Sequence, residues 1–275
     1  MLPNFLVIGS MKSGTSSLYQ YLRGHPQIFM TREKEPSFFA GNWSHGLAWY
    51  EHLFEGVGTA IAIGEASTEY SIFPFVPNVP TRIAEVIPDV RLIYLVRHPI
   101  ERMLSEYHYN VIRGLERNSS ADRSLLTDLT YECASRYALQ VEQYLAHFDR
   151  SQLLIVRSED LRRDRLRALR RIHTFLGVDA SWEPLNIEQE FNRSSEKRRR
   201  RPLDGRLRKL PGYRVLASVA PSALRDFKRQ LTTSKAPPRS ALSDRARSEL
   251  EDRLRDDVRR LHRYVGDQFD GWGIA

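Results

Sequence analysis

The sequence predicts an α/β fold with a mostly parallel sheet flanked by helices, on three observations. The stretch from Phe5 to Leu22 runs from a short apolar segment through a Gly/Ser/Lys turn into a helical segment, as in a strand–loop–helix unit. Residues 90–96 are an almost continuous apolar run, as in a parallel strand that is buried on both faces. Strand-like and helix-like segments then alternate along the chain, which favours parallel βαβ connections.

Each predicted element has a local signal in the chain. Apolar runs predict strands at 5–9, 28–30, 61–65, 90–96 and 153–156. Helices are predicted from the first loop to about Arg23, at 47–54 and 81–87, from Pro99 through Val111, and at 131–148, 160–176 and 244–265. Pro99 suits a first helical turn, and Ser243 and Gly266 suit the two ends of the last helix. The aromatic and proline-rich stretch 68–80 and the polar stretch 118–128 are predicted as loops.

Length, charge and cysteine content narrow the class of protein. The 275 residues are 41% hydrophobic, which is enough for a sizeable core, and we expect a single domain over 1–275. The net charge of +8 favours an anionic ligand or surface. Cys133 is the single cysteine, which excludes an internal disulfide and favours a reducing compartment. No apolar run approaches the roughly 20 residues that span a membrane, and no signal peptide is evident, so we expect a cytoplasmic protein.

The loop between the first strand and the first helix is the leading candidate for a binding site. Such a loop directs several backbone N–H groups at one point, and the N-terminus of the following helix adds partial positive charge there. Lys12 adds a full positive charge in the middle of the loop. The expected ligand is therefore a phosphate-like anion.

The residue order in this loop disfavours a metal-dependent nucleotide enzyme. Nucleoside triphosphatases end their loop in Gly, then Lys, then Ser or Thr, whereas here the order is Lys12-Ser13-Gly14-Thr15. A Mg²⁺-dependent enzyme also needs an acidic residue at the end of a nearby buried strand. The strands at 90–96 and 153–156 are instead followed by Arg97 and Arg157. A metal-dependent phosphotransferase is thus the weaker alternative, and we expect no metal site.

A second anion site is predicted around Arg97. Pro99 starts a helix, so His98 and Ser105 are about two turns apart and lie near one face of it. Arg97 offers a planar fork of donors, and Ser105 offers a hydroxyl. Either residue alone could be an ordinary surface residue, but an arginine at a strand end followed by His-Pro and a helix favours a site.

The basic run from Lys197 to Arg201 leaves a different function open. Such a run is typical of an exposed charged face or of a nucleic-acid-binding surface. An Arg-rich nucleic-acid-binding protein is therefore an alternative hypothesis from another functional class.

The two anion motifs together resemble those of the sulfotransferases that use 3′-phosphoadenylyl sulfate (PAPS). The stretch Lys12 to Thr15 is similar to their 5′-phosphosulfate loop, and 92–107, with Arg97 and Ser105, is similar to their 3′-phosphate motif. The resemblance is greatest to the heparan sulfate 3-O/N-sulfotransferase-like branch, and it covers almost the whole chain in order. It includes residues 35–39, 44–50 and 191–192, the basic stretch that follows them, the terminal helix and Trp272.

The resemblance implies a P-loop-type three-layer fold and a metal-independent reaction. A sulfuryl group would pass from PAPS to a hydroxyl or amine, with release of adenosine 3′,5′-bisphosphate (PAP). Lys12 would stabilise the leaving phosphate, and Glu35 would be the general base that deprotonates the acceptor. Glu33 is a nearby carboxylate without that role. The implied nucleotide-binding residues are Lys12, Ser13, Gly14, Thr15, Ser16, Ser17, Arg97, Ser105, Lys197, Arg198 and Arg199.

Three residues of this chain differ from those of that branch, and the differences indicate which acceptor the protein uses. Ser16, Ser37 and Ala66 stand where the branch has a basic residue, a histidine and a lysine. The loss of these groups predicts an acceptor less charged than heparan, namely a carbohydrate, a glycolipid or a secondary metabolite, in a bacterial enzyme. No nucleic-acid partner is expected, and a homodimer is left open. Aromatic residues that could line the acceptor site, or simply belong to the core, are Trp43, Trp49, Tyr50, Tyr70, Phe73 and Phe75.

Overall fold

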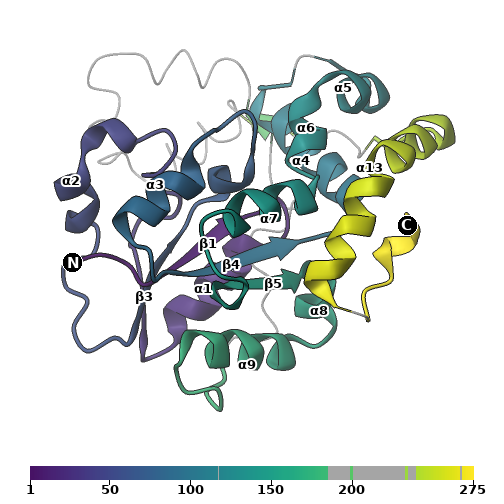
Figure 1. Ribbon diagram of the computed structural model, residues 1–275. Coiled ribbons are helices and arrows are strands. Elements are labelled where there is room, and N and C mark those ends of the chain that lie inside the picture. Colours follow the sequence, from purple (N-terminus) through teal and green to yellow (C-terminus); the bar gives the residue numbers. More distant parts are fainter. Residues whose placement is uncertain (117, 185–198, 201–232, 235–239, 267) are drawn as a thin grey trace, which may run out of the picture.

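The computed structural model describes residues 1–116, 118–184, 199–200, 233–234, 240–266 and 268–275. Within them, a five-stranded parallel sheet has the strand order β2-β3-β1-β4-β5 and lies between layers of helices (Figure 1). The strands are β1 (Phe5–Gly9), β2 (Ile28–Met30), β3 (Ala62–Ala66), β4 (Arg91–Val96) and β5 (Leu153–Arg157). The predicted α/β class with a mostly parallel sheet is confirmed.

Strand β1 lies at the centre of the sheet, paired with β3 and β4, and its side chains are buried on both faces. Leu6 and Ile8 belong to the core on one face, and Phe5 and Val7 belong to the core on the other. This alternation follows from the two-residue period of a strand. A sheet buried in this way needs helices on both faces, so the apolar strands require three layers.

Helices from different parts of the chain cover the two faces. One core contains residues of α1 (Thr15–Gly24) and α9 (Arg165–Leu176). The other contains residues of α3 (Val79–Val86), α7 (Tyr137–Leu145) and α13 (Asp244–Val265). A third cluster joins α4 (Pro99–Arg113), α5 (Ala121–Thr127) and α6 (Leu129–Cys133) to the first half of α13. The other described elements are η1 (Trp43–His45), α2 (Leu47–His52), η2 (Thr68–Ser71), η3 (Arg150–Gln152), α8 (Ser158–Arg163), β6 (Arg199–Arg200), β7 (Thr233–Ser234) and η5 (Gly271–Gly273).

The prediction of a loop at 118–128 was wrong, because most of this stretch is helix α5. The Ser120 hydroxyl caps the helix by accepting from the Arg123 amide at 3.3 Å. Ala121 and Leu125 are buried in the cluster with α4 and α13. The polar composition concealed this short apolar face, which forms a helix only where another helix packs against it.

Two predicted helices are each divided into two. The stretch 131–148 is divided between α6 and α7, because Asp257 of α13 caps α7 by accepting from the amides of Ala138 and Leu139, both at 2.9 Å. The stretch 160–176 breaks at Asp164, whose carboxylate caps α9. The last helix, in contrast, begins and ends as predicted, with Ser243 as its N-cap.

Candidate functional site

The carboxyl ends of all five strands meet at one edge of the sheet, where ligands bind in open α/β folds. The segments that leave these ends carry Lys12 after β1, Glu35 after β2, Thr68 after β3, Arg97 after β4 and Ser158 after β5. The tertiary structure therefore brings the two predicted catalytic residues and the predicted 3′-phosphate arginine to the same edge.

The loop between β1 and α1 is held in shape by its own polar groups and by glycine. The hydroxyls of Ser10 and Ser13 are buried and 2.6 Å apart, and the Ser13 amide donates to the Ser10 carbonyl at 3.2 Å. A Cβ on Gly9 would lie 1.9 Å from the Ser71 hydroxyl, so only glycine fits there. Ser13 therefore shapes the loop from inside. Lys12 has a positive φ of 69°, which turns the chain at the centre of the loop.

The N-terminus of α1 is arranged to receive an anion. Gly14 is the N-cap residue, in a left-handed conformation, and no side chain caps the helix. No acidic residue lies in the first turn. The first amides of a helix have no intrahelical acceptor, so those of Thr15 and Ser16 are donors at the positive end of the helix dipole. The side chain of Thr15 is buried, whereas Ser16 and Ser17 are half-buried.

Helix α4 connects the two predicted phosphate motifs. The ammonium group of Lys12 lies over the ring of Tyr109, 4.7 Å from its centroid. Tyr109 follows Ser105 by one helical turn, so both residues are on the same face of α4. Lys12 thus contacts the face of α4 that carries Ser105.

Arg97 is half-buried beside the loop. Its guanidinium donates to the Lys12 carbonyl at 3.3 Å, and its own carbonyl accepts from the Tyr137 hydroxyl at 2.7 Å. Burial lowers the pKa of Arg97, and the positive charge of Arg162 lowers it further. Arg162 is anchored through the Ser158 hydroxyl at 3.0 Å. Two cations near one another at this edge make an anionic ligand electrostatically favourable.

Arg102 is a residue of this region that the sequence reasoning missed. Its side chain is fully buried and donates to the Ser135 hydroxyl at 2.7 Å and to the Tyr131 carbonyl at 2.8 Å. It also donates to the Met11 carbonyl at 3.4 Å and pairs with Glu106 at 2.7 Å. Arg102 therefore supports the loop between β1 and α1. The i,i+4 spacing of Arg102 and Glu106 indicates an ion pair, but nothing in the sequence indicates that the pair is buried.

Glu35 lies in a strained loop beside β3. Its φ is 63°, and its amide donates to the Ala66 carbonyl at 3.0 Å. The Thr68 hydroxyl donates to its Oε1 atom at 3.3 Å, and Lys34 pairs with the same oxygen. The side chain is 47% exposed. Glu35 therefore extends outward from the loop.

The buried carboxyl of this region is Glu65, at the end of β3. It is fully buried and accepts from the hydroxyls of Ser67 at 2.8 Å and Tyr50 at 3.4 Å. Burial raises the pKa of Glu65 to about 7, although hydrogen bonds from Tyr70, Ser67 and Tyr50 act in the opposite direction. A glutamate at the end of an apolar strand was the available sequence signal, but it was not given a role.

The basic stretch is only partly described. Arg199 lies in β6, which pairs with β7 and lies against α4, the helix that carries Ser105. Lys197 and Arg198 lie outside the described residues, as does most of the stretch around them. The backbone position of β6 brings Arg199 to the helix of the predicted 3′-phosphate motif.

The aromatic residues predicted to line an acceptor site separate into two groups. Tyr50 and Tyr70 are buried, with exposed fractions of 0% and 2%, which agrees with the alternative that they belong to the core. Trp43 and Trp49 are partly buried and pack on Phe38, with ring centroids 5.1 and 6.2 Å away. Phe73 is partly buried, and Phe75 is 49% exposed.

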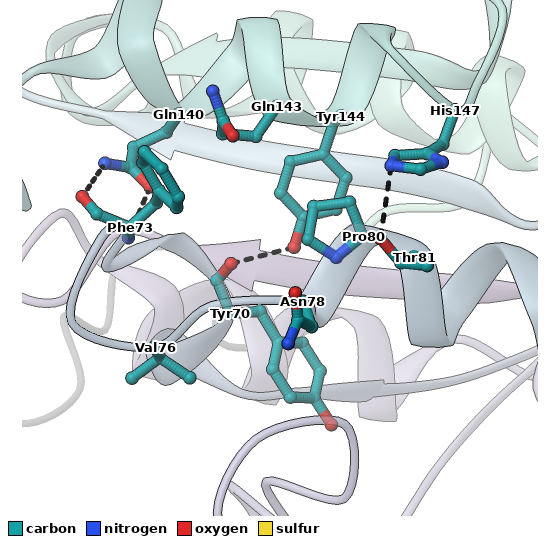
Figure 2. Close-up of a pocket in the computed structure, with 10 residues that line it drawn as sticks. All are labelled: Tyr70, Phe73, Val76, Asn78, Pro80, Thr81, Gln140, Gln143, Tyr144 and His147. Carbon is teal, nitrogen blue, oxygen red and sulfur yellow. Dashed lines mark hydrogen bonds between the residues drawn. The ribbon is translucent and has the colours of Figure 1, made fainter.

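A small pocket lies between α7 and the segment from η2 to α3 (Figure 2). Its volume is about 100 Å³. Gln140 donates to and accepts from the backbone of Phe73, both at 2.9 Å, and Tyr144 donates to the Tyr70 carbonyl at 2.8 Å. These internal bonds attach the segment after η2 to α7. Of the predicted residues, only Tyr70 and Phe73 line this pocket, so it is separate from the loop of Lys12.

The part of the chain that the structure describes shows neither a cluster of metal-ligating residues nor a membrane-spanning helix. No group of three or more His, Cys, Asp or Glu residues there is placed to hold a metal ion. No helix in that part has the length and apolarity needed to cross a bilayer.

Comparisons with known proteins agree with this geometry. The model of the sulfotransferase domain family matches residues 2–203. The chain is 42% identical over 122 residues to the membrane-associated sulfotransferase kil1 of Dictyostelium discoideum, covering 43% of this chain and 25% of that protein. It is 32% identical over 185 residues to mouse heparan sulfate glucosamine 3-O-sulfotransferase 3B1, covering 64% of this chain and 46% of that protein.

Another relative belongs to the N-sulfotransferase type. Mouse bifunctional heparan sulfate N-deacetylase/N-sulfotransferase 4 is 32% identical over 199 residues, covering 64% of this chain and 22% of that protein. The predicted resemblance to both types is confirmed. The chain spans less than half the length of each of these three relatives.

Solved structures share the fold over nearly the whole chain. A sulfotransferase from Alicyclobacillus acidocaldarius superposes with a TM-score of 0.71 and 24% identity, covering 99% of both chains. Mouse sulfotransferase SULT7A1, solved in complex with PAP, gives a TM-score of 0.52 and 13% identity, covering 99% of this chain and 87% of that one.

Proposed function

The chain belongs to the sulfotransferase domain family, and we propose that it transfers a sulfuryl group from PAPS to a hydroxyl or amine of its acceptor and releases PAP. The observation that carries this proposal is the meeting of the Lys12 loop, Arg97 and Ser105 at one sheet edge. One nucleotide with a 5′-phosphosulfate and a 3′-phosphate would use both sets of cations.

The donor would be held by the loop and by α4. Lys12 and the first amides of α1 would contact the 5′-phosphosulfate, while Arg97 and Ser105 would contact the 3′-phosphate. Arg162 adds positive charge beside Arg97, and the position of β6 against α4 supports a contribution from Arg199. Ser13 and Thr15, whose side chains are buried, would contribute to binding through the shape of the loop and through the helix dipole.

In the transfer step, the acceptor oxygen or nitrogen forms a bond to sulfur while the bond from sulfur to the phosphate oxygen breaks. The leaving phosphate gains negative charge, which Lys12 and the loop amides stabilise. The acceptor loses one proton, and Glu35 takes it. Both described contacts of the Glu35 carboxylate use Oε1, so Oε2 is the proposed proton acceptor.

The acceptor class follows from groups that are missing at this edge. Ala66 and Ser37 have uncharged side chains, so neither position presents a cation to the acceptor. Ala66 is also buried, and the amide of Ser37 is bonded to the Ser67 hydroxyl at 2.9 Å. The similarity to 3-O- and N-sulfotransferases supports a glycan-like acceptor, and the absent cations support one less charged than heparan. A carbohydrate, a glycolipid or a secondary metabolite remains the proposed class.

Thermal unfolding with nucleotides tests the proposal. PAP at millimolar concentration should raise the melting temperature by ligand linkage, and ATP with Mg²⁺ should raise it much less. A shift with ATP and Mg²⁺ but none with PAP would instead indicate a phosphotransferase. Steeply salt-dependent DNA or RNA binding that PAP does not compete with would indicate the nucleic-acid-binding alternative. A screen of acceptors, scored by PAP release, then identifies the substrate class.

A further inference from the structure

The proposed reaction gives no role to Glu65, although burying its carboxyl is costly. A carboxylate that leaves water loses its hydration, and the loss is offset only by hydrogen bonds or a counter-charge. Ser67, Tyr50 and Tyr70 each donate a hydroxyl hydrogen bond to it. Lys34 is the described cation that acts on its charge. The carboxyl is therefore satisfied mainly by neutral hydroxyls in the interior.

Two of these hydroxyls also hold the loop of Glu35. The Ser67 hydroxyl accepts from the Ser37 amide at 2.9 Å, and the Tyr70 hydroxyl accepts from the Phe39 amide at 3.3 Å. A hydroxyl has one proton to donate and lone pairs that can accept. Because each proton points at Glu65, the lone pairs face the loop amides. The carboxylate thus fixes the orientation of both hydroxyls.

The loop that these bonds hold is strained. Glu35 and Ser37 have φ angles of 63° and 49°, in the left-handed region that side chains other than glycine rarely adopt. Such conformations are unfavourable for residues with a side chain and persist only where the surroundings determine them. The amides of Ser37 and Phe39 and the Ala66 carbonyl supply these restraints around Glu35.

We infer that Glu65, in its ionised form, is the positioning residue for Glu35: it orients Ser67 and Tyr70, which hold the 35–39 loop in its strained conformation. The inference deepens the proposed function and rests on it for the role of Glu35. Protonation of Glu65 turns one carboxyl oxygen into a donor, so one hydroxyl loses its acceptor and the loop is held less firmly.

Few other groups near Glu65 titrate close to neutral pH. Tyr50 on α2, Tyr70 on η2 and Tyr144 on α7 face it, and burial raises the pKa of each well above its usual value. These tyrosines stay protonated from pH 5 to pH 9 or so. The pH dependence of the loop therefore reports on Glu65.

The test measures amide hydrogen exchange at Ser37 and Phe39 in the full chain, as protection factors at about pH 6 and about pH 8. In the wild-type protein, protection at both amides should rise about tenfold with pH. In Glu65→Gln the rise should disappear. The matched control is Glu69→Gln, the same change at an exposed glutamate of η2, which should behave as wild type. Equal protection in Glu65→Gln and wild type at both pH values would overturn the inference.

Activity measurements and a second variant distinguish a failure of this inference from a misfolded variant and from a failure of the proposed function. With an acceptor from the screen, Glu65→Gln should lower kcat about tenfold or more and leave the KM for PAPS within about twofold. If Glu65→Gln does not fold, Ser67→Ala decides: loss of protection at Ser37 with retention at Phe39 supports the inference, and retention at both sites contradicts it. Failure of wild type to bind PAP would overturn the proposed function, while the exchange result would still decide what holds the loop.

Discussion

The loop at 9–15 and the loop at 35–39 end at the same sheet edge but are held by different means. The first is a strand–loop–helix unit stabilised by its own serines and glycines, with Arg102 behind it. The second is held by the hydroxyls of Ser67, which directly follows β3, and of Tyr70 in η2, and both donate to a buried carboxyl. The proposed donor side therefore forms largely from a local motif, whereas the proposed acceptor side forms only after distant segments have packed together. Substitutions should separate binding from catalysis along this division.

Glu35→Gln should have the largest effect, on the acceptor side alone. Removal of the general base should lower kcat about 1,000-fold, while the thermal shift with PAP stays unchanged. Steady-state kinetics and melting curves with PAP measure the two quantities. The matched control is Glu33→Gln, two residues earlier on the exposed surface. Normal turnover by Glu35→Gln would place the base elsewhere.

Lys12→Ala should affect the donor side through both binding and chemistry. Loss of the charge that stabilises the leaving phosphate should lower kcat/KM about 100-fold to 1,000-fold, and the melting shift with PAP should shrink. A variant that keeps its PAP affinity and its rate would remove the loop from the mechanism. Arg23→Ala is a suitable control, because it removes an exposed cation from the far end of the same helix.

Arg102→Ala tests whether the donor loop depends on tertiary support. The change leaves Glu106 partly buried without its cation and removes the bond to Met11, so the free energy of unfolding should fall by about 3 kcal/mol. Urea denaturation measures this loss. Arg97→Ala should cost far less stability and weaken PAP binding instead. Equal losses of stability in both variants would mean that the two arginines share one structural role.

The smallest expected effect concerns stability and pH at Glu65. Burial raises its pKa from 4.5 to about 7, so its favourable contribution to folding is present below about pH 4.5 and is lost as the pH rises through 7. Between about pH 4.5 and pH 8, wild-type stability should fall by about 2 to 3 kcal/mol relative to Glu65→Gln. Denaturation curves for both proteins across this range give the difference.

Asp257 is a second buried carboxyl that affects the pH dependence of stability. Burial raises its pKa to about 6, so its contribution to stability changes with pH in the same direction. Because Asp257 is present in both proteins, its effect cancels in the comparison. A wild-type pH dependence identical to that of Glu65→Gln would show that Glu65 does not titrate in this range.

Sequence reasoning succeeded where neighbouring residues determine structure. The strand at 5–9, the loop lysine, the strand before Arg97 and the caps of the last helix were all predicted correctly. It failed where a distant side chain decides the outcome. Asp257 caps α7 and divides a predicted helix, and the packing of α5 against α4 and α13 makes a helix of a polar stretch.

The sequence by itself determined the parallel sheet, the loop between β1 and α1 and the strand-end arginine, because apolar runs and a strand–loop–helix motif act over a few residues. The tertiary structure decided that Glu35 extends outward, that Glu65 is the buried carboxyl and that Arg102 supports the loop. Burial and the orientation of a hydroxyl depend on residues far apart in the chain, such as Phe39 and Tyr70. Such long-range contacts cannot be inferred from a local sequence pattern. In this protein, they restrain the loop of Glu35, the residue proposed to deprotonate the acceptor.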